Sequence, residues 1–105
     1  QPVALDAQSF ARQVGRRQVP VVVDFWAPWC GPCRMMAPAF EQAAQALAPG
    51  VQLAKLDTEA HPHAAAPWNI RSIPTMVVFK EGREIARVSG ALPAGEIVRW
   101  VRSVV

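Results

Sequence analysis

Cysteine is scarce in this sequence, whose 105 residues include only two, Cys30 and Cys33. A small secreted domain held together by disulfides usually has four or more cysteines at wider separations. A bridge between Cys30 and Cys33 would close a very short loop, and such a loop contributes little stability because it restricts the unfolded chain only slightly. The two cysteines are therefore candidates for chemistry rather than for a structural disulfide.

Long hydrophobic runs and clustered charge are also missing. No apolar run approaches the roughly 18 residues that a membrane-spanning helix needs, so we expect no membrane contact. The net charge is only +3 and the eleven lysines and arginines are spread along the chain, so we expect no nucleic-acid partner. No Gly-rich dinucleotide fingerprint is present, and we expect no bound cofactor. The length and the 51% hydrophobic content predict a single domain over residues 1–105.

The spacing of apolar residues predicts alternating helices and strands. Helices are predicted at 9–14, at 33–47 and after Pro93, and strands at 19–26, 51–56, 75–79 and 84–89. The segment 57–68 is interrupted by prolines and is predicted to be irregular or weakly helical. We therefore expect an α/β fold with a mixed central β-sheet, in which a parallel βαβ unit lies beside an antiparallel hairpin and helices cover both faces.

The position of the cysteines suggests thiol–disulfide exchange. Cys30 lies where a predicted strand turns into a helix, and the N-terminus of a helix favours an anion such as a thiolate. Cys33 is predicted to lie on the same helix face and to be more buried. Such a pair fits a reaction in which Cys30 attacks a substrate disulfide and Cys33 resolves the mixed disulfide. Between them, Pro32 restricts the backbone and Gly31 lets a partner chain approach closely.

The segment DFWAPWCGPC at residues 24–33 resembles the active-site segment of thioredoxins. The order of the predicted elements, the tripeptide Ile-Pro-Thr at 73–75 and Gly90 extend the resemblance over nearly the whole chain. The resemblance implies a thioredoxin fold and a protein-disulfide reductase that acts on disulfide-containing client proteins and is recharged by an NADPH-dependent thioredoxin reductase. The segments 57–61 and 70–74 resemble the second bacterial thioredoxin type, whose members usually carry a cysteine-rich zinc-binding segment that this sequence does not contain.

Two charged residues acquire roles through the resemblance. Asp24 matches an aspartate that lies beneath the second cysteine, has a raised pKa and helps to deprotonate that cysteine. Lys55, on the neighbouring predicted strand, matches the lysine that approaches this aspartate. The alternative is that Asp24 and Lys55 form a satisfied ion pair with no catalytic part.

The resemblance also implies a docking surface for clients. Pro74 matches a proline held in the cis form opposite the cysteines, where it presents the backbone of Ile73 to an extended client segment. The residues expected to border this surface are Trp29, Gly31, Pro32, Ile73, Pro74, Gly90 and Ala91. Trp26 is expected to be a core aromatic packed against the active-site turn. Trp68-Asn69 and Ser72 depart from the commonest pattern, and we expect them to affect partner preference.

Three other interpretations remain open from the residues. Cys30 and Cys33 could bind zinc with His61 and His63, although the two histidines lie closer together than in usual zinc sites. The fold also serves disulfide oxidases and isomerases, in which a histidine commonly replaces Pro32. Pro32 favours a reducing protein instead, and the lack of a basic-then-apolar leader segment favours a cytoplasmic one. Nothing in the sequence demands more than a monomer, so we expect a monomer. Finally, some thioredoxin-like domains act only as binding scaffolds.

Overall fold

The computed structural model describes residues 2–16 and 19–105 of the chain. In chain order the elements are β1 (Val3–Leu5), α1 (Ala7–Arg16), β2 (Val21–Trp26), α2 (Gly31–Leu47), β3 (Gln52–Asp57), α3 (Pro62–Ala65), the 3₁₀ turn η1 (Ala66–Trp68), β4 (Thr75–Lys80), β5 (Arg83–Ser89) and α4 (Ala94–Val104).

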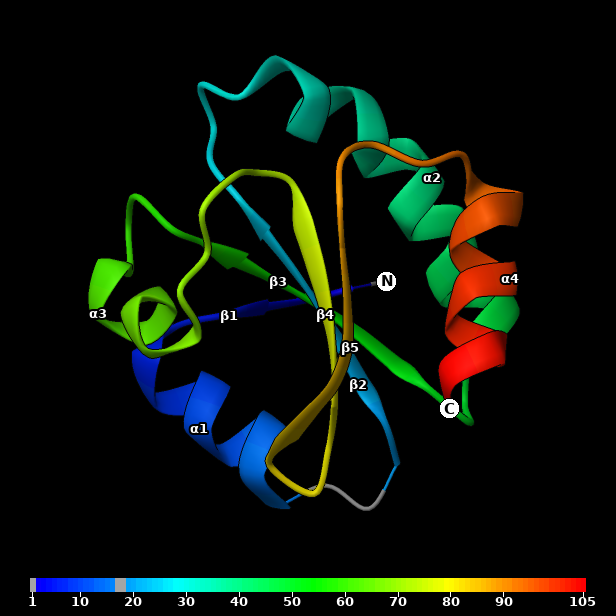
Figure 1. Cartoon of the computed structure of the whole chain (residues 1–105), viewed down its shortest axis with the longest axis horizontal. Helices are drawn as coiled ribbons and strands as arrows, with labels where there is room; N and C mark the ends of the chain where they lie inside the picture. Colours follow the sequence, from blue (N-terminus) through cyan, green and yellow to red (C-terminus); the bar gives the residue numbers. More distant parts are fainter. Residues whose placement is uncertain (1, 17–18) are drawn as a thin grey trace.

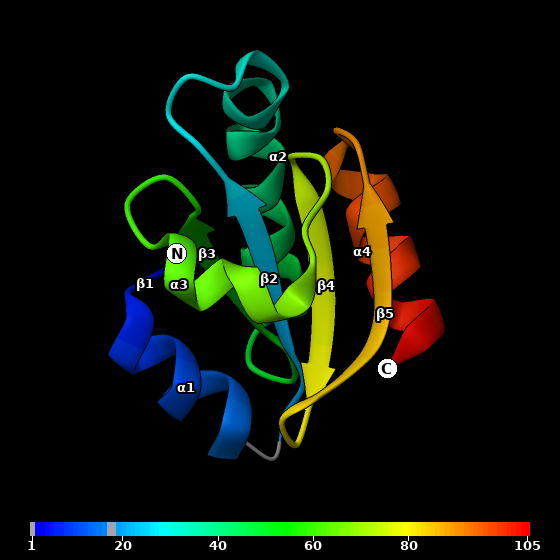
Figure 2. The same cartoon turned by 60° about the vertical axis from the view of Figure 1, so that its left-hand side comes forward.

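The strands form one mixed sheet in the order β1-β3-β2-β4-β5. Strands β1 and β2 both run parallel to β3, whereas β4 runs antiparallel to β2 and to β5. Helices α2 and α4 cover one face of the sheet, and α1 and α3 cover the other (Figures 1 and 2). The predicted α/β architecture, with a mixed sheet between two helical layers, is confirmed.

Strand β2 is buried along most of its length because it lies in the centre of the sheet and both of its faces are covered. Val22 packs with α2 and α4, whereas Val21, Val23 and Phe25 pack on the opposite face with α1 and α3. Since successive side chains of a strand point to opposite faces, Asp24 points to the same face as Val22, toward the layer that contains α2.

Most differences from the sequence prediction lie at the N-terminal end. Strand β1 was not predicted, since it is short and only Leu5 among its residues is buried. Helix α1 begins earlier than residue 9 because Asp6 and Ser9 cap it reciprocally: the Ser9 N–H donates to Asp6 Oδ1 and the Asp6 N–H donates to Ser9 Oγ, each at 2.8 Å. The helix also continues through Gly15, where the sequence predicted its end.

The remaining elements agree closely with the prediction. Helix α3 and η1 form the weakly helical connection expected at 57–68, and α4 begins directly after Pro93. Within the ranges 2–16 and 19–105, no helix is both long enough and apolar enough to cross a membrane.

Candidate active site

The two cysteines lie at the N-terminus of α2, immediately after the turn that follows β2, and they form a disulfide with a Cα–Cα distance of 5.2 Å. Cys30 is the N-cap residue, with non-helical backbone angles of φ −85° and ψ 111°. Its Sγ accepts a hydrogen bond from the backbone N–H of Cys33 at 3.2 Å. Unpaired N–H groups at the first turn of a helix stabilise negative charge, so this geometry favours a thiolate on Cys30 once the disulfide is reduced.

Both cysteines are largely covered by their surroundings. Cys30 is 4% exposed and Cys33 is 2% exposed, so the predicted difference in burial has the expected direction but is small. Ala27 is buried with them, and Trp26 and Ile73 pack against the same cluster, which confirms that Trp26 packs against the active-site turn. The disulfide is therefore enclosed by Ala27, Trp26 and Ile73.

Asp24 is a buried carboxyl group on the α2 face of β2. The residue is only 1% exposed, and neither carboxyl oxygen has a hydrogen-bond partner within the described residues. Burial raises the pKa of Asp24 to about 7, while the positive charge of Lys55 opposes this change. A carboxyl group with this pKa changes its protonation state near neutral pH.

Lys55 lies beside Asp24 in the sheet, since these two residues are partners in the parallel register of β2 and β3. Its ammonium group is stacked over the ring of Trp26, with Nζ 4.5 Å from the ring centroid. Among the residues that the structure describes, the ion pairs are Arg87–Glu84 and Arg99–Glu96, and Asp24 and Lys55 do not form one. Asp24 and Lys55 are therefore neighbours without a direct ion pair, which differs from the interpretation in which the two charges satisfy each other.

The backbone of Ile73 faces the disulfide. Its carbonyl oxygen lies 3.8 Å from the Sγ atom of Cys30, and the Ile73–Pro74 peptide bond is cis, as the resemblance implied. Gly90 follows β5 with a φ of 99°, a conformation that favours glycine, and its N–H donates to the Pro74 carbonyl oxygen at 2.9 Å.

The other predicted docking residues surround this point with different exposures. Trp29 is 67% exposed, Pro32 and Ala91 are exposed, and Gly31 is half-buried. An open pocket of about 370 Å³ adjoins Ile73. The pocket is lined by Thr58, Pro62, Ala65, Ala66, Asn69, Ile70 and Ile73.

Several residues near the cysteines were not predicted from the sequence. Arg34 donates from Nη1 to the Pro28 carbonyl oxygen at 3.2 Å, and Thr58 donates from Oγ1 to the Trp26 carbonyl oxygen at 3.1 Å, so both brace the turn after β2. Met35, two residues after Cys33 in α2, is 80% exposed, although a methionine in an amphipathic helix is usually assigned to the core. The only sequence signal for the contact of Arg34 with the turn is that Arg34 directly follows Cys33, in the first turn of the predicted helix.

The described residues do not place Cys30, Cys33, His61 and His63 close enough together to bind zinc. In residues 2–16 and 19–105, no three side chains of His, Cys, Asp or Glu are gathered so that they could hold a metal ion. The four residues considered as ligands are consequently not assembled around one point in this structure.

Comparison with known proteins agrees with this geometry. The thioredoxin family model matches residues 1–103. Thioredoxin C-3 of Corynebacterium nephridii is 46% identical over 101 residues, which cover 96% of this chain and 69% of that protein. Thioredoxin of Synechocystis sp. is 47% identical over 92 residues, covering 88% and 85% of the two chains, and that of Rhodospirillum rubrum is 42% identical over 95 residues, covering 90% and 91%. The sheet and its helical layers are thus a thioredoxin fold. This chain belongs to the thioredoxin family and is a thiol–disulfide oxidoreductase with Cys30 and Cys33 as its redox-active pair.

Proposed function

We propose that Cys30 is the attacking thiolate and Cys33 the resolving thiol in the reduction of client protein disulfides. The Cys30 thiolate attacks one client sulfur, the client S–S bond breaks, and the other client sulfur leaves as a thiolate that takes up a proton. Cys33 then loses its proton and attacks the Sγ of Cys30. The mixed disulfide breaks, the Cys30–Cys33 disulfide forms, and the client leaves as a dithiol with two more electrons.

The observation that carries this assignment of roles is the hydrogen bond from the Cys33 N–H to the Cys30 Sγ at 3.2 Å. This bond and the helix N-terminus favour negative charge on Cys30, whereas Cys33 lies inside the first turn and is the more buried residue of the pair. The order of attack follows from this difference.

Asp24 is proposed to accept the proton of Cys33 in the second step. Its burial, the lack of a hydrogen-bond partner in the part of the chain that the structure describes, and its pKa of about 7 support this role. Lys55 is proposed to act through Asp24, because its positive charge favours the carboxylate form without direct ion pairing.

An extended client segment is proposed to pair with the backbone of Ile73, opposite Cys30. The 3.8 Å separation between the Ile73 carbonyl oxygen and Cys30 Sγ supports this geometry, because it brings the client backbone close to the sulfur. The proposed border of the docking surface consists of Trp29, Gly31, Pro32, Pro74, Gly90 and Ala91. The 67% exposure of Trp29 supports its role as an apolar contact.

The same proposal covers the setting in which the chain works. We place it as a single domain over residues 1–105, a monomer in the cytoplasm, without nucleic-acid or membrane partners. An NADPH-dependent thioredoxin reductase would recharge it, so the nicotinamide and flavin would belong to that enzyme and this chain would need no cofactor beyond its own disulfide. The family match over residues 1–103 and Pro32 between the cysteines support this setting.

Trapping the mixed disulfide tests the order of attack. Incubated with an oxidised client protein, the reduced Cys33→Ser variant should accumulate a covalent adduct through Cys30, detectable by intact mass and released by dithiothreitol. The matched Cys30→Ser variant should form little adduct. An adduct that forms mainly with Cys30→Ser would reverse the roles. A reduction potential of the wild-type pair well below that of the glutathione pool is expected, and a potential above it would favour an oxidase.

A further inference from the structure

The segment 69–74 joins η1 to β4 and brings Ile73 to the disulfide without belonging to a helix or strand. It provides the carbonyl oxygen that lies 3.8 Å from Cys30 Sγ. Its residues Asn69, Ile70 and Ile73 also line the open pocket described above, and Ile73 packs against the cluster that contains Cys30 and Cys33. The position of this segment therefore determines both the backbone offered to a client and the surface next to the reacting sulfur.

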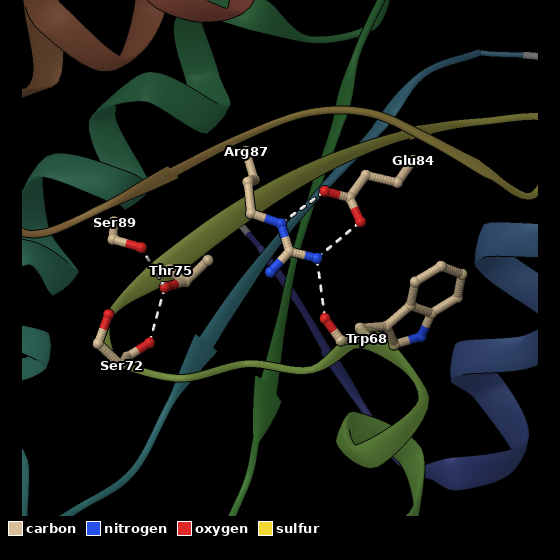
Figure 3. Close-up of polar contacts among 6 residues, drawn as sticks. All are labelled: Trp68, Ser72, Thr75, Glu84, Arg87 and Ser89. Atoms are coloured by element: carbon tan, nitrogen blue, oxygen red, sulfur yellow. Dashed lines mark hydrogen bonds and ion pairs between the residues drawn. The ribbon is translucent and has the colours of Figure 1, made fainter.

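Arg87 on β5 holds the beginning of this segment (Figure 3). Its Nη2 donates to the carbonyl oxygen of Trp68 at 2.8 Å, immediately before residue 69. Its Nε and Nη2 also donate to the two carboxylate oxygens of Glu84, which is a bidentate arrangement that fixes the plane of the guanidinium. Trp68 is seated in turn against Phe79, with ring centroids 4.7 Å apart.

An irregularity in the β4–β5 ladder makes this arrangement possible. Residues such as Glu84 and Arg87 would point to opposite faces of a regular strand. The register shifts between Val78 and Phe79, so that Phe79 is opposite Glu84 and Val77 is opposite Arg87. Val77 and Phe79 both pack on the α1 and α3 face, and the shift therefore brings Glu84 and Arg87 to that same face, beside Trp68.

The end of the segment is held to β5 as well (Figure 3). Thr75 Oγ1 donates to the Ser72 carbonyl oxygen at 2.7 Å and shares a hydrogen bond of 2.8 Å with Ser89 Oγ. The N–H of Gly90 donates to the Pro74 carbonyl oxygen. Strand β5 thus anchors the segment at both ends, although β5 itself is an edge strand far in sequence from the cysteines.

We propose that Arg87 is a positioning residue for client binding, which holds Trp68, and through it the segment 69–74, where the Ile73 backbone can pair with a client beside Cys30. This inference rests on the proposed pairing of clients with Ile73. Loss of the Arg87 guanidinium removes the hydrogen bond that holds the beginning of the segment. A client must then immobilise the segment when it binds, which weakens its binding. A small disulfide that needs only the Cys30 sulfur does not require that order.

The test compares two substrates in steady-state reduction. For Arg87→Ala we expect the KM for insulin to rise about three- to tenfold, as loss of a charge-assisted hydrogen bond permits, with little change in kcat. The rate with the small aromatic disulfide DTNB and the reduction potential of the cysteine pair should stay at wild-type values. Glu84→Gln, which keeps the shape of the carboxylate but weakens the bidentate pair, should raise the KM for insulin by a smaller factor.

Arg99→Ala is the matched control. Arg99 also pairs with a glutamate, Glu96, at 3.3 Å, but this pair lies on α4 and is more exposed than Arg87–Glu84. The control removes the same charge without touching the segment, so its KM for insulin should equal that of the wild type. At the other end of the segment, Thr75→Val removes the hydroxyl and should raise the KM for insulin. Thr75→Ser keeps the hydroxyl and should leave the KM at the wild-type value.

The outcomes separate this inference from the proposed function. If Arg87→Ala and Arg99→Ala have equal KM values for insulin, the inference is wrong and the proposed function stands. If Arg87→Ala loses activity equally with insulin and DTNB, Arg87 supports the fold or the redox pair and the inference is again wrong. If the wild type reduces neither substrate, the proposed function itself fails.

Discussion

Replacement of Asp24 by asparagine should stabilise the oxidised protein at neutral and alkaline pH. The wild-type carboxyl group is 1% exposed and has no hydrogen-bond partner among the described residues, so its ionised form is costly to bury. Asparagine has nearly the same shape and no charge. The variant therefore isolates the cost of the buried carboxylate from the cost of a cavity.

The raised pKa sets the size and the sign of the effect. Burial moves the pKa of Asp24 from 3.8 to about 7. Between these values the folded protein keeps a proton that the unfolded chain has lost, so the contribution of Asp24 to stability is highest below the unfolded pKa and falls as the pH rises through the folded pKa. One pKa unit corresponds to about 1.4 kcal/mol. Between the unfolded and the folded pKa, the contribution of this group to the free energy of unfolding of the wild type therefore falls by up to roughly 4 kcal/mol, and the Asp24→Asn variant has no such loss.

Urea unfolding of both oxidised proteins between about pH 4 and about pH 8.5 measures this difference, because the other titrating groups cancel in the comparison. The advantage of Asp24→Asn should grow from near zero at the acidic end to its full value above about pH 8. Asp6→Asn is the control, because hydrogen bonds from Ser9 lower the pKa of the exposed Asp6. The free energy of unfolding of this variant should not exceed that of the wild type at high pH. A difference between Asp24→Asn and wild type that does not change with pH would refute the reasoning.

Two further predictions concern the surroundings of Asp24 and the core. Lys55→Met removes the positive charge that lowers the pKa of Asp24, so the pH dependence of unfolding described above should move to higher pH; a shift to lower pH would show that Lys55 does not act on the carboxylate. Phe40→Ala empties a fully buried position of α2 against the sheet and should cost about 3–5 kcal/mol in urea unfolding, while a loss below about 1 kcal/mol would mean that the core closes over the gap.

The redox pair could be predicted from the sequence because its geometry depends on neighbours in the chain. A buried strand, a turn and a helix that follow one another place Cys30 at a helix N-terminus whatever the rest of the fold does. The same holds for the long periodic elements, α2 and α4, and for the β4–β5 hairpin, whose turn residues are adjacent. The cis form of Pro74, in contrast, could be expected only from the resemblance to thioredoxins, since most X-Pro bonds are trans.

The arrangement around Asp24 required the tertiary structure. The sequence identified a carboxylate in a buried strand and a lysine in the next strand, and a direct ion pair was one interpretation. The distance between two long side chains depends on every group that packs around them, and here the ring of Trp26 takes the Lys55 ammonium instead. Asp24 is consequently left without a partner among the described residues.

By itself the sequence determined the family, the fold class, the redox cysteines and most helices and strands, because motifs and hydrophobic periodicity are local properties of the chain. The tertiary structure alone decided the pairing of β1 with β3, the absence of an ion pair between Asp24 and any other described residue, and the attachment of the segment 69–74 to Arg87 and Thr75. Each of these depends on contacts between residues far apart in sequence. A register shift in one strand is enough to turn a side chain to the other face, and no local pattern records it.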